Sequence, residues 1–598
     1  MCGIIGAVAE SAISPVLDGL SRLEYRGYDS SGISILTNNQ IQTLKVQGKL
    51  DNLKHILSEH PLEGSCAIGH TRWATHGKAT DTNAHPHQCG QVSVVHNGII
   101  ENYLLLKQKL LLLGHHFKSS TDSEVIPHLI NHYLSQKMTQ EEAIEQAISQ
   151  LQGSYALGVL INGSKSNLYA IKQGSPLVIS QGKNGVYIAS DALALGADSG
   201  KIYYPKDNEL VKLNAHEITL CGQSLNKKIH YINNNNCTEI VSKGKHSSFM
   251  EKEIFEQVPL LDKLSVDSQS KRYSAINFNT ISKMTIIACG TSYYAASVAK
   301  FWFEKYANIP VEIDIASEYR YRSPIITKNE LTIFVSQSGE TADTLAALRY
   351  AKDKNAQTLA LVNAVNSSIA READFTFEIY AGPEIGVAST KAFTCQLAIF
   401  YKMCLEAAKQ REYLTNSELQ QLQSDFSHLP NSIENILGRC EDMNTFAKQI
   451  SNYSNTLFLG RGILTPIAQE GALKLKEISY IHAEGYAAGE LKHGPIALLD
   501  EQMPVIVIAP KDSLTDKLLS NIQEVQARNA PLFIIGDSSI REYVNLKENE
   551  FFELPAIPES ILPIVSVIPL QLLALFCAQA LGKNVDQPRN LAKSVTVE

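Results

Sequence analysis

Hydrophobic and polar residues follow different patterns in the two parts of the chain. Over residues 1 to about 235, short apolar runs predict strands, and three longer amphipathic runs predict helices. The connections between the strands are short, which is typical of antiparallel hairpins. This part is therefore predicted to be an α+β domain. The expected helices cover residues 12–24, 100–113 and 123–136, and the expected strands cover residues 32–36, 92–95, 155–161, 168–172, 176–180 and 186–190.

From about residue 280, apolar strands alternate with helices, which is typical of a parallel α/β sheet. The pattern occurs twice. A strand, a Gly-containing loop and a helix begin at Met284 and again at Thr456, and a further strand follows at Thr332 and at Val505. We interpret this as an internal duplication of a doubly wound unit. The polar residues 233–247, with a run of asparagines, predict a linker before it.

The composition limits the kind of protein. With 598 residues the chain is too long for one core, and 44% hydrophobic and 19% charged residues are ordinary for a soluble globular protein. A net charge of -8 argues against nucleic acid as the main partner. Ten cysteines without CxxC pairs predict reduced thiols of a cytosolic protein, not a disulfide framework or a zinc site. The start of the chain lacks the pattern of a signal peptide.

Residues 561–580 carry no charge and are long enough to span a bilayer. They also contain Pro563, Pro569, Gln571 and Gln579. We therefore expect a buried helix that is entered from a Pro-rich loop, and no contact with a membrane.

The first candidate nucleophile is Cys2, which becomes the N-terminal residue if Met1 is removed. Its thiolate would be the nucleophile, and its own α-amino group could be the base that takes up the thiol proton, since both groups titrate near pH ~8. This stretch alone leaves open that Cys2 is an ordinary buried cysteine in a strand.

Residues suited to a small charged ligand gather between His70 and Glu124. Arg72 offers a planar fork for a carboxylate, and Asp122 could hold an ammonium group. The Asn97 amide and the Gly98 backbone N–H could form an oxyanion hole. Each of these assignments has a purely structural alternative. Arg72 could lie in a surface loop and pack against Trp73, Asn97-Gly98 could form a type I′ hairpin turn, and Asp122 could belong to a helix cap.

Five motifs in this part, in this order, resemble the glutaminase domain of class II (N-terminal-nucleophile, Ntn) amidotransferases: residues 2–4, 26–30, 70–77, 96–98 and 121–124. The resemblance implies that Cys2 attacks the glutamine side-chain amide and forms a glutamyl thioester. It further implies that Asn97 and Gly98 stabilise the oxyanion. The glutamine-binding residues would be Arg72 for the α-carboxylate, Asp122 for the α-amine, and Trp73, Thr75, His76 and His85 in the loops that line the pocket.

In the first α/β copy, two strands end in hydroxyl-rich loops, at residues 289–292 and 336–341. Hydroxyls and free N–H groups at a helix N-terminus form an anion site, most naturally for phosphate, unless they only cap the helices. Neither loop contains GxxxxGK[ST] or GxGxxG, so ATP and NAD are disfavoured.

The second copy contributes acid–base groups. Glu470, Lys474 and Glu477 share one helix face, and their apolar surroundings argue against a solvated ion pair. His493 lies in a Gly-bounded loop and is a candidate acid or base. The polar tail, residues 586–598, would ordinarily be frayed.

These features resemble a tandem pair of sugar isomerase (SIS) domains, and the whole chain resembles the glutamine–fructose-6-phosphate aminotransferase family, the glucosamine-6-phosphate synthases. The implied fold is an α+β Ntn glutaminase domain followed by two α/β doubly wound SIS domains. By this resemblance His493 opens the hexose ring, Lys593 forms a Schiff base with the C2 carbonyl, and Glu477 moves a proton between C1 and C2 with help from Lys474. The sugar-phosphate-binding residues would be Ser336, Gln337, Ser338 and Thr341, with Thr291 and Ser292 nearby.

The resemblance also implies the organisation and partners of the chain. The expected segments are a glutaminase domain at 2–232, a linker at 233–247, SIS domains at 248–435 and 436–585, and an active-site tail at 586–598. A cytoplasmic homodimer is expected, with L-glutamine and fructose 6-phosphate as substrates and with no metal or organic cofactor. The reaction would be the first committed step of amino-sugar (UDP-N-acetylglucosamine) biosynthesis.

Three other functions fit the sequence less well. A class II amidotransferase that acts on a phosphoribosyl acceptor or on aspartate would need a diphosphate loop or an ATP site, and neither pattern is visible. A sugar-phosphate-binding regulator would not need Cys2, Glu477 or Lys593. An enzyme that uses free ammonia or deaminates sugars would not need an intact Cys2, Arg72 and Asn97.

Overall fold

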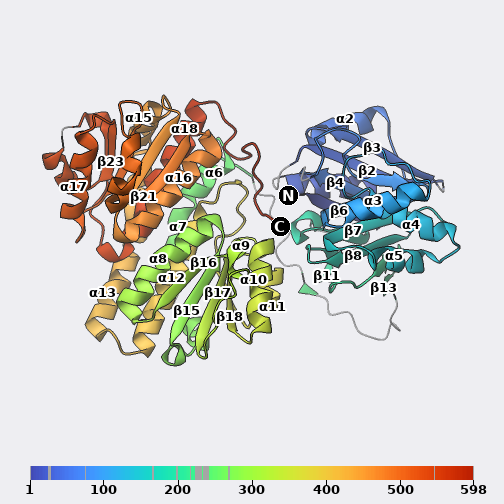
Figure 1. Cartoon of the computed structure of the whole chain (residues 1–598), viewed down its shortest axis with the longest axis horizontal. Helices are drawn as coiled ribbons and strands as arrows, with labels where there is room; N and C mark the ends of the chain where they lie inside the picture. Colours follow the sequence, from blue (N-terminus) through green and yellow to red (C-terminus); the bar gives the residue numbers. More distant parts are fainter. Residues whose placement is uncertain are drawn as a thin grey trace. The chain divides into compact units, whose positions relative to one another are not determined.

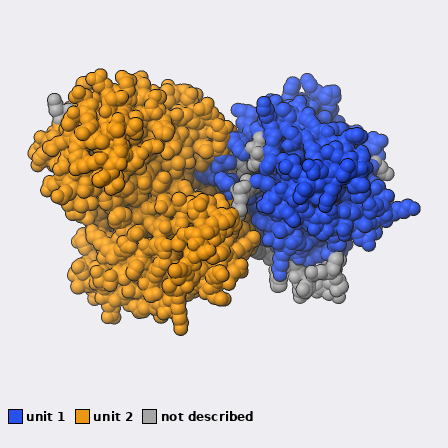
Figure 2. All heavy atoms as spheres, in the orientation of Figure 1, with its two compact units in different colours: residues 1–240, 592–598 blue, residues 241–591 orange. Residues whose placement is uncertain are grey.

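The computed structural model divides the chain into two compact units (Figures 1 and 2). Unit 1 consists of residues 1–240 and 592–598, and unit 2 of residues 241–591. The residues described are 2–24, 28–38, 40–73, 76–163, 167–196, 200–215, 217–221, 232–233, 242–266, 270–544 and 546–596.

Unit 1 is built on two antiparallel sheets. One has the strand order β14-β11-β9-β10-β1-β4-β2-β3, and the other has the order β13-β12-β8-β7-β6-β5. β1 begins one residue after Cys2 and lies in the interior of its sheet, between β10 and β4. The strands are β1 Gly3–Ala9, β2 Ser30–Thr37, β3 Gln40–Gln47, β4 Cys66–Arg72, β5 His87–Cys89, β6 Val92–Ile100, β7 Gly153–Ile161, β8 Leu168–Gln173, β9 Val178–Gln181, β10 Gly185–Ala189, β11 Lys201–Tyr203, β12 Val211–Leu213, β13 Ile218–Leu220 and β14 Ile232–Asn233.

The two sheets pack face to face, with helices on both outer faces. Ile4 of the first sheet and Val95 of the second belong to the core between the sheets. On the other face of the first sheet, Ile5 packs with Val16 of α1. This arrangement of four layers confirms the predicted α+β class. The helices are α1 Ile13–Leu23, α2 Leu50–Glu59, α3 Tyr103–Leu112, α4 Val125–Ser135 and α5 Gln140–Ile148.

One strand of unit 1 differs from its prediction in a way that affects the site. The strand expected at residues 92–95 continues to Ile100, and Gly98 pairs with Tyr155 of β7. Gly98 has φ +130°, and a Cβ atom there would lie 2.0 Å from the Ser154 carbonyl oxygen. Asn97-Gly98 is therefore not a hairpin turn, because the close approach of β7 requires a glycine inside the strand.

Unit 2 contains two parallel sheets with equivalent strand orders, β16-β15-β17-β18-β19 and β21-β20-β22-β23-β24. This confirms the predicted duplication, and both orders are those of a doubly wound fold. The strands are β15 Lys283–Ala288, β16 Val311–Ile315, β17 Glu330–Ser336, β18 Gln357–Val362, β19 Phe375–Glu378, β20 Asn455–Gly460, β21 His482–Ala487, β22 Val505–Ala509, β23 Leu532–Gly536 and β24 Phe551–Glu553.

One continuous hydrophobic core joins the two halves of unit 2. It contains Trp302 and Phe400 from the first half and Leu475 and Leu572 from the second. The helices are α6 Phe249–Phe255, α7 Gln257–Val266, α8 Gly290–Ala307, α9 Ala316–Tyr319, α10 Ala342–Asp353, α11 Ser368–Glu372, α12 Lys391–Gln410, α13 Asn416–Ser427, α14 Leu429–Leu437, α15 Cys440–Ile450, α16 Thr465–Ser479, α17 Thr515–Gln526 and α18 Leu562–Ala580.

The uncharged stretch near the C-terminus forms α18. It is long and apolar enough to cross a membrane, but 94% of its most apolar window is buried inside the protein. This confirms the predicted buried helix. The predicted linker at residues 233–247 lies mostly outside the described residues, so the domain limits stay a prediction.

Candidate functional sites

Cys2 lies at the start of β1, beside the end of β4. The Trp73 backbone N–H donates to Cys2 Sγ at 3.2 Å. Burial raises the pKa of the Cys2 thiol, although the Trp73 backbone and the Arg72 guanidinium act in the opposite direction. The thiol therefore needs a base before it can attack.

Asn97 is held between Cys2 and His70. Its Nδ2 donates to the Cys2 carbonyl oxygen at 3.0 Å, and its Oδ1 lies 3.0 Å from His70 Nε2. His70 Nε2 also lies 3.1 Å from the His96 carbonyl oxygen, so this nitrogen carries the proton and donates. Burial lowers the pKa of His70 to about 3, which keeps the ring neutral. His70 thus fixes the Asn97 amide with its NH₂ group toward the nucleophilic residue.

Arg72 is buried, and its guanidinium faces its own loop. It donates to the carbonyl oxygens of His76, of Gly77 at 3.0 Å and of Lys78 at 3.4 Å. Asp29 Oδ1 lies 3.8 Å from Arg72 Nη1. The side chain is therefore not part of a simple surface contact, since its charge is enclosed beside Cys2.

Asp122 does not cap a helix. Its Oδ2 accepts from the Ile100 backbone N–H at 2.8 Å, at the end of β6, and α4 has no side-chain cap. The structure thus ties Asp122 to the strand that carries Asn97 and Gly98.

The other predicted glutamine-binding residues have varied settings. Trp73 and His76 are half-buried, and the His76 ring packs edge-on against Tyr103, with centroids 5.6 Å apart. His85 is buried and stacks on His70 at 4.2 Å. Thr75 lies outside the described residues.

The loop after β17 is a tight turn that leads into α10. Ser336 Oγ is hydrogen-bonded to Thr341 Oγ1 at 2.9 Å and accepts from the Gly339 N–H at 3.0 Å. The Thr341 hydroxyl therefore braces the loop and makes no side-chain cap bond to α10. Ser338 Oγ accepts from the Glu340 N–H at 3.2 Å. Hydroxyls at the carboxyl end of a strand and the start of a helix suit an anionic group.

Glu470, Lys474 and Glu477 share one face of α16, as predicted, and this face is not solvated. Glu470 and Lys474 are 0% and 1% exposed. Lys474 Nζ lies 2.5 Å from Glu477 Oε2 and 3.5 Å from Glu470 Oε1. The alternative of a solvated ion pair is therefore wrong.

Thr291 of α8 completes this cluster. Its hydroxyl donates to Glu470 Oε1 at 3.1 Å, and Lys474 Nζ donates to Thr291 Oγ1 at 3.0 Å. Burial raises the pKa of Glu470 to about 8, although Lys474 opposes the shift. Burial lowers the pKa of Lys474, but Glu470 and Glu477 outweigh it and keep the pKa above its ordinary value. Lys474 is thus a charged donor, and Glu470 titrates near neutral pH.

The other two predicted phosphate contacts are Ser292, in the first turn of α8, and Gln337, in the loop after β17. Ser292 Oγ accepts from Gln396 Nε2 at 3.0 Å, and the Gln337 carbonyl oxygen accepts from the Asn363 N–H. Among the described residues, no hydrogen bond or ion pair joins His493 to Lys474 or Glu477. His493 ends the 3₁₀ helix η6 Ala488–His493 and is exposed.

The start of the tail is fixed at Asp586 and Arg589. The Asp586 carboxylate accepts from the backbone N–H groups of Phe249 and Met250, at 3.0 and 2.9 Å. The Arg589 N–H donates to the Tyr480 hydroxyl at 2.7 Å. Residues 592–598, which include Lys593, belong to unit 1. Residues 586–589 are therefore not frayed.

Two domain families match the chain. A glutamine amidotransferase domain matches residues 70–197, and the SIS domain matches residues 278–405 and 449–578. The chain is 45% identical to the glutamine–fructose-6-phosphate aminotransferase [isomerizing] of Brucella suis biovar 1 (strain 1330), and 46% identical to that of Bartonella quintana (strain Toulouse). Both matches cover 100% of each chain. The chain belongs to the glutamine–fructose-6-phosphate aminotransferase family.

A solved structure agrees with this membership. The C-terminal domain of the Francisella tularensis glucosamine-fructose-6-phosphate aminotransferase is 42% identical and matches with a TM-score of 0.55. The match covers 58% of this chain and 100% of that domain.

The two sites also contain residues to which the sequence pattern assigned no role. His70 and Asp29 stand inside recognised motifs, but only the structure shows that they hold Asn97 and Arg72. Glu384 is buried, and one of its oxygens accepts from the N–H groups of Thr390 and Ala392, both at 3.0 Å. It braces the start of α12, and its charge acts on Lys474. No spacing pattern marks Glu384 in the sequence.

Proposed function

We propose that this chain transfers the amide nitrogen of L-glutamine to fructose 6-phosphate and isomerises the product to glucosamine 6-phosphate, with release of glutamate. The observation that carries the proposal is the presence of two different sites in one member of this family. Unit 1 orders a cysteine beside an amide donor and a buried arginine, and unit 2 buries a lysine between two carboxylates.

In unit 1, Cys2 Sγ attacks the glutamine amide carbon, and ammonia leaves as a glutamyl thioester forms. Because burial keeps the thiol protonated, the reaction needs a base, which the α-amino group of Cys2 supplies once Met1 is removed. One N–H of the Asn97 amide donates to the Cys2 carbonyl oxygen, which holds the amide beside the nucleophile. Its other N–H donates to the oxyanion, and the Gly98 N–H supplies the second donor.

The substrate's charged ends are bound by Arg72 and Asp122. The carbonyl contacts of Arg72 are neutral, so a carboxylate can replace one of them with a stronger, charge-assisted pair. Asp122 is anchored through Oδ2, and Oδ1, which accepts a long bond of 3.4 Å from Ser123 Oγ, keeps a second lone pair for the α-ammonium group. Trp73, Thr75, His76 and His85 line the pocket in this proposal.

In unit 2, Ser336, Gln337, Ser338 and Thr341 hold the phosphate, with Thr291 and Ser292 beside them. Glu477 is the group that moves a proton between C1 and C2, because its side chain is 21% exposed and Lys474 Nζ fixes its position at 2.5 Å. Lys474 places a positive charge beside the reacting carbons.

Two further roles rest on the family resemblance alone. Lys593 forms the Schiff base with the C2 carbonyl, and His493 opens the hexose ring. We also expect the chain to form a homodimer, which sedimentation of the purified protein would test.

Product analysis tests the whole proposal. The wild-type chain, with loss of Met1 checked by mass spectrometry, should make glucosamine 6-phosphate and glutamate in equal amounts. Cys2→Ala should make neither from glutamine, and should make glucosamine 6-phosphate when ammonium is supplied. Cys440→Ala, at another half-buried cysteine, is the matched control and should behave as wild type. Formation of glutamate without amino sugar by the wild type would show that the acceptor is a different molecule.

A further inference from the structure

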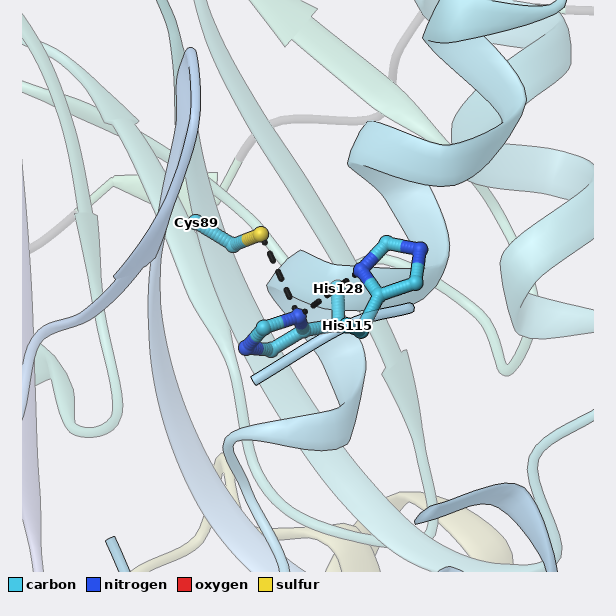
Figure 3. A group of neighbouring side chains, drawn as sticks. All are labelled: Cys89, His115 and His128. Atoms are coloured by element: carbon cyan, nitrogen blue, oxygen red, sulfur yellow. Dashed lines mark hydrogen bonds between the residues drawn. The ribbon is translucent and has the colours of Figure 1, made fainter. Parts of the chain in front are cut away.

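A second cluster of chemistry-bearing side chains lies in unit 1, and the glutaminase mechanism does not use it. Cys89 ends β5, His115 follows α3, and His128 lies on α4. Figure 3 shows the three side chains converging on one point. His128 Nδ1 lies 3.2 Å from Cys89 Sγ and 3.0 Å from His115 Nδ1. The three ligand atoms all lie within 4.8 Å of one another.

Hydrogen bonding alone satisfies this cluster poorly. A neutral imidazole nitrogen carries either one proton or one lone pair in the ring plane. His128 Nδ1 can therefore make one good hydrogen bond, yet two potential partners approach it. A cation between the three atoms would use all three lone pairs at once.

The other ring nitrogen of His128 has the setting of a metal ligand. His128 Nε2 lies 3.7 Å from Glu124 Oε1. The Glu124 carboxylate is itself held by the N–H groups of Lys118 at 2.8 Å and Ser119 at 2.6 Å. At 3.7 Å the two groups are in ion-pair contact but not hydrogen-bonded. A shift of a few tenths of an ångström would let Nε2–H donate to Glu124, which is the usual support of a histidine that binds a metal through its other nitrogen.

The distances also fit a small tetrahedral ion. Zinc–sulfur and zinc–nitrogen bonds of ~2.3 and ~2.0 Å place neighbouring ligand atoms roughly 3.3–3.6 Å apart. The two separations from His128 Nδ1, 3.2 and 3.0 Å, need to widen by only a few tenths of an ångström, and the third, from Cys89 Sγ to His115 Nδ1, is at most 4.8 Å. Cys89 and His115 are half-buried, so an ion can reach the point from solvent.

We propose that Cys89 Sγ, His115 Nδ1 and His128 Nδ1 bind a borderline-soft divalent cation of the Zn²⁺ type. Binding releases the Cys89 thiol proton to solvent and forms one metal–thiolate bond and two metal–imidazole bonds. The fourth position is open to water or to His132. That residue lies one helical turn after His128, and its ring is 5.6 Å from the His115 ring. The ion would join β5, the segment after α3, and α4.

Cobalt titration of the full-length chain tests this proposal. A Cys2→Ala parent removes the catalytic thiol, and a chelator removes bound metal before Co²⁺ is added. The parent should bind one equivalent of Co²⁺ with a thiolate-to-cobalt charge-transfer band, and Zn²⁺ should displace it. Cys89→Ser should abolish the band, and His115→Gln should weaken Zn²⁺ binding by at least ~100-fold. Cys221→Ser, at a half-buried cysteine elsewhere in unit 1, should change neither result.

Thermal unfolding gives an independent readout. Zn²⁺ should raise the unfolding temperature of the parent and of Cys221→Ser, but not that of His115→Gln, because only a native-state site stabilises the fold by binding. A parent without the charge-transfer band, or a band that survives Cys89→Ser at the same affinity, would overturn the proposal. His115→Gln lies outside any helix or strand, so it keeps the test valid if Cys89→Ser folds poorly.

Discussion

The two halves of unit 2 share one strand order but carry different chemistry at equivalent places. After its first strand, the first half begins α8 with Thr291 and Ser292, whereas the second half continues into α16 with its buried charges. After its third strand, the first half forms the hydroxyl-rich loop 336–341, whereas the second half has Pro510 and Lys511.

The halves meet where their chemistry differs. α8 and α16 pack against each other (Figure 1), and the Thr291 hydroxyl contacts both Glu470 and Lys474. Duplication thus produced two halves with the same strand order. We infer that the first half became specialised for binding an anion and the second half for transferring protons. A sugar phosphate has its phosphate at one end and its reacting carbons at the other. Two adjoining halves can therefore each bind one end.

The largest effect that this division predicts is on proton transfer. Glu477→Gln should lower the rate of glucosamine 6-phosphate formation by about 10²- to 10⁴-fold, because an amide cannot take up the proton. Glutamate release at Cys2 should continue, and both products are measured in the same assay. Lys476→Met removes an exposed charge from the same helix and should leave the rate unchanged. Equal losses of both products would contradict a proton-transfer role confined to the second half.

The buried charges should also make stability depend on pH. Burial raises the pKa of Glu470 from its ordinary 4.5 to about 8, with Lys474 opposing. The folded state then binds the proton more tightly than the unfolded chain, so this stabilisation is complete below pH 4.5 and is lost as the pH rises through 8. At ~1.4 kcal/mol per pKa unit, the loss is at most about 5 kcal/mol.

Glu470→Gln removes this group and tests the direction. Calorimetric unfolding of the full chain should show the variant gaining stability relative to wild type between pH ~5 and ~8. Glu304→Gln, at an acid on α8 whose side chain is 44% exposed, should show no such trend. A difference between Glu470→Gln and wild type that is independent of pH would mean that Glu470 stays ionised throughout.

Local patterns were enough to predict the class of each unit. The periodicity of single segments marked β2 and β6–β10 of unit 1 and both copies of the doubly wound unit, but it gave no prediction for α2 or α5. The end of β6 was missed because Asn97-Gly98 is also a strong turn signal. Only the close approach of β7, with Ser154 against Gly98, explains why the strand continues.

The candidate sites were predictable where their residues stand in short motifs. The α16 residues share a face because of their spacing alone. Glu384 carries no such signal, although its partners Thr390 and Ala392 are only six and eight residues away, because this spacing belongs to no known motif. The Cys89, His115 and His128 cluster carries none because it joins β5, the segment after α3, and α4. The apolar neighbours of Glu470 and Lys474 already argued against a solvated ion pair, but the sequence did not show that packing between the two halves encloses them.

A smaller loss is expected where the two halves touch. Thr291→Val keeps the shape of the side chain but removes hydrogen bonds to Glu470 and to the charged Lys474. Such bonds contribute ~1.5–3 kcal/mol, so synthesis should slow about 10- to 100-fold while glutamate release is kept. Ser297→Ala, whose hydroxyl only bonds back to the Tyr293 carbonyl on the same helix, is the control. A Thr291→Val chain with the wild-type rate would show that the halves act independently.

The smallest effect should separate binding from chemistry. Ser338→Ala removes one hydroxyl from the loop after β17, and a hydrogen bond of about 1 kcal/mol corresponds to a rise in KM for fructose 6-phosphate of roughly 5-fold, with kcat unchanged. Ser513→Ala removes an exposed hydroxyl from the loop after β22, the equivalent place in the second half, and should change neither constant. Initial rates over a range of fructose 6-phosphate concentrations measure both. If Ser513→Ala raises the KM as much as Ser338→Ala does, both halves bind the phosphate and the proposed division between them is wrong. If Ser338→Ala lowers kcat instead, the first half takes part in the chemistry as well as in binding.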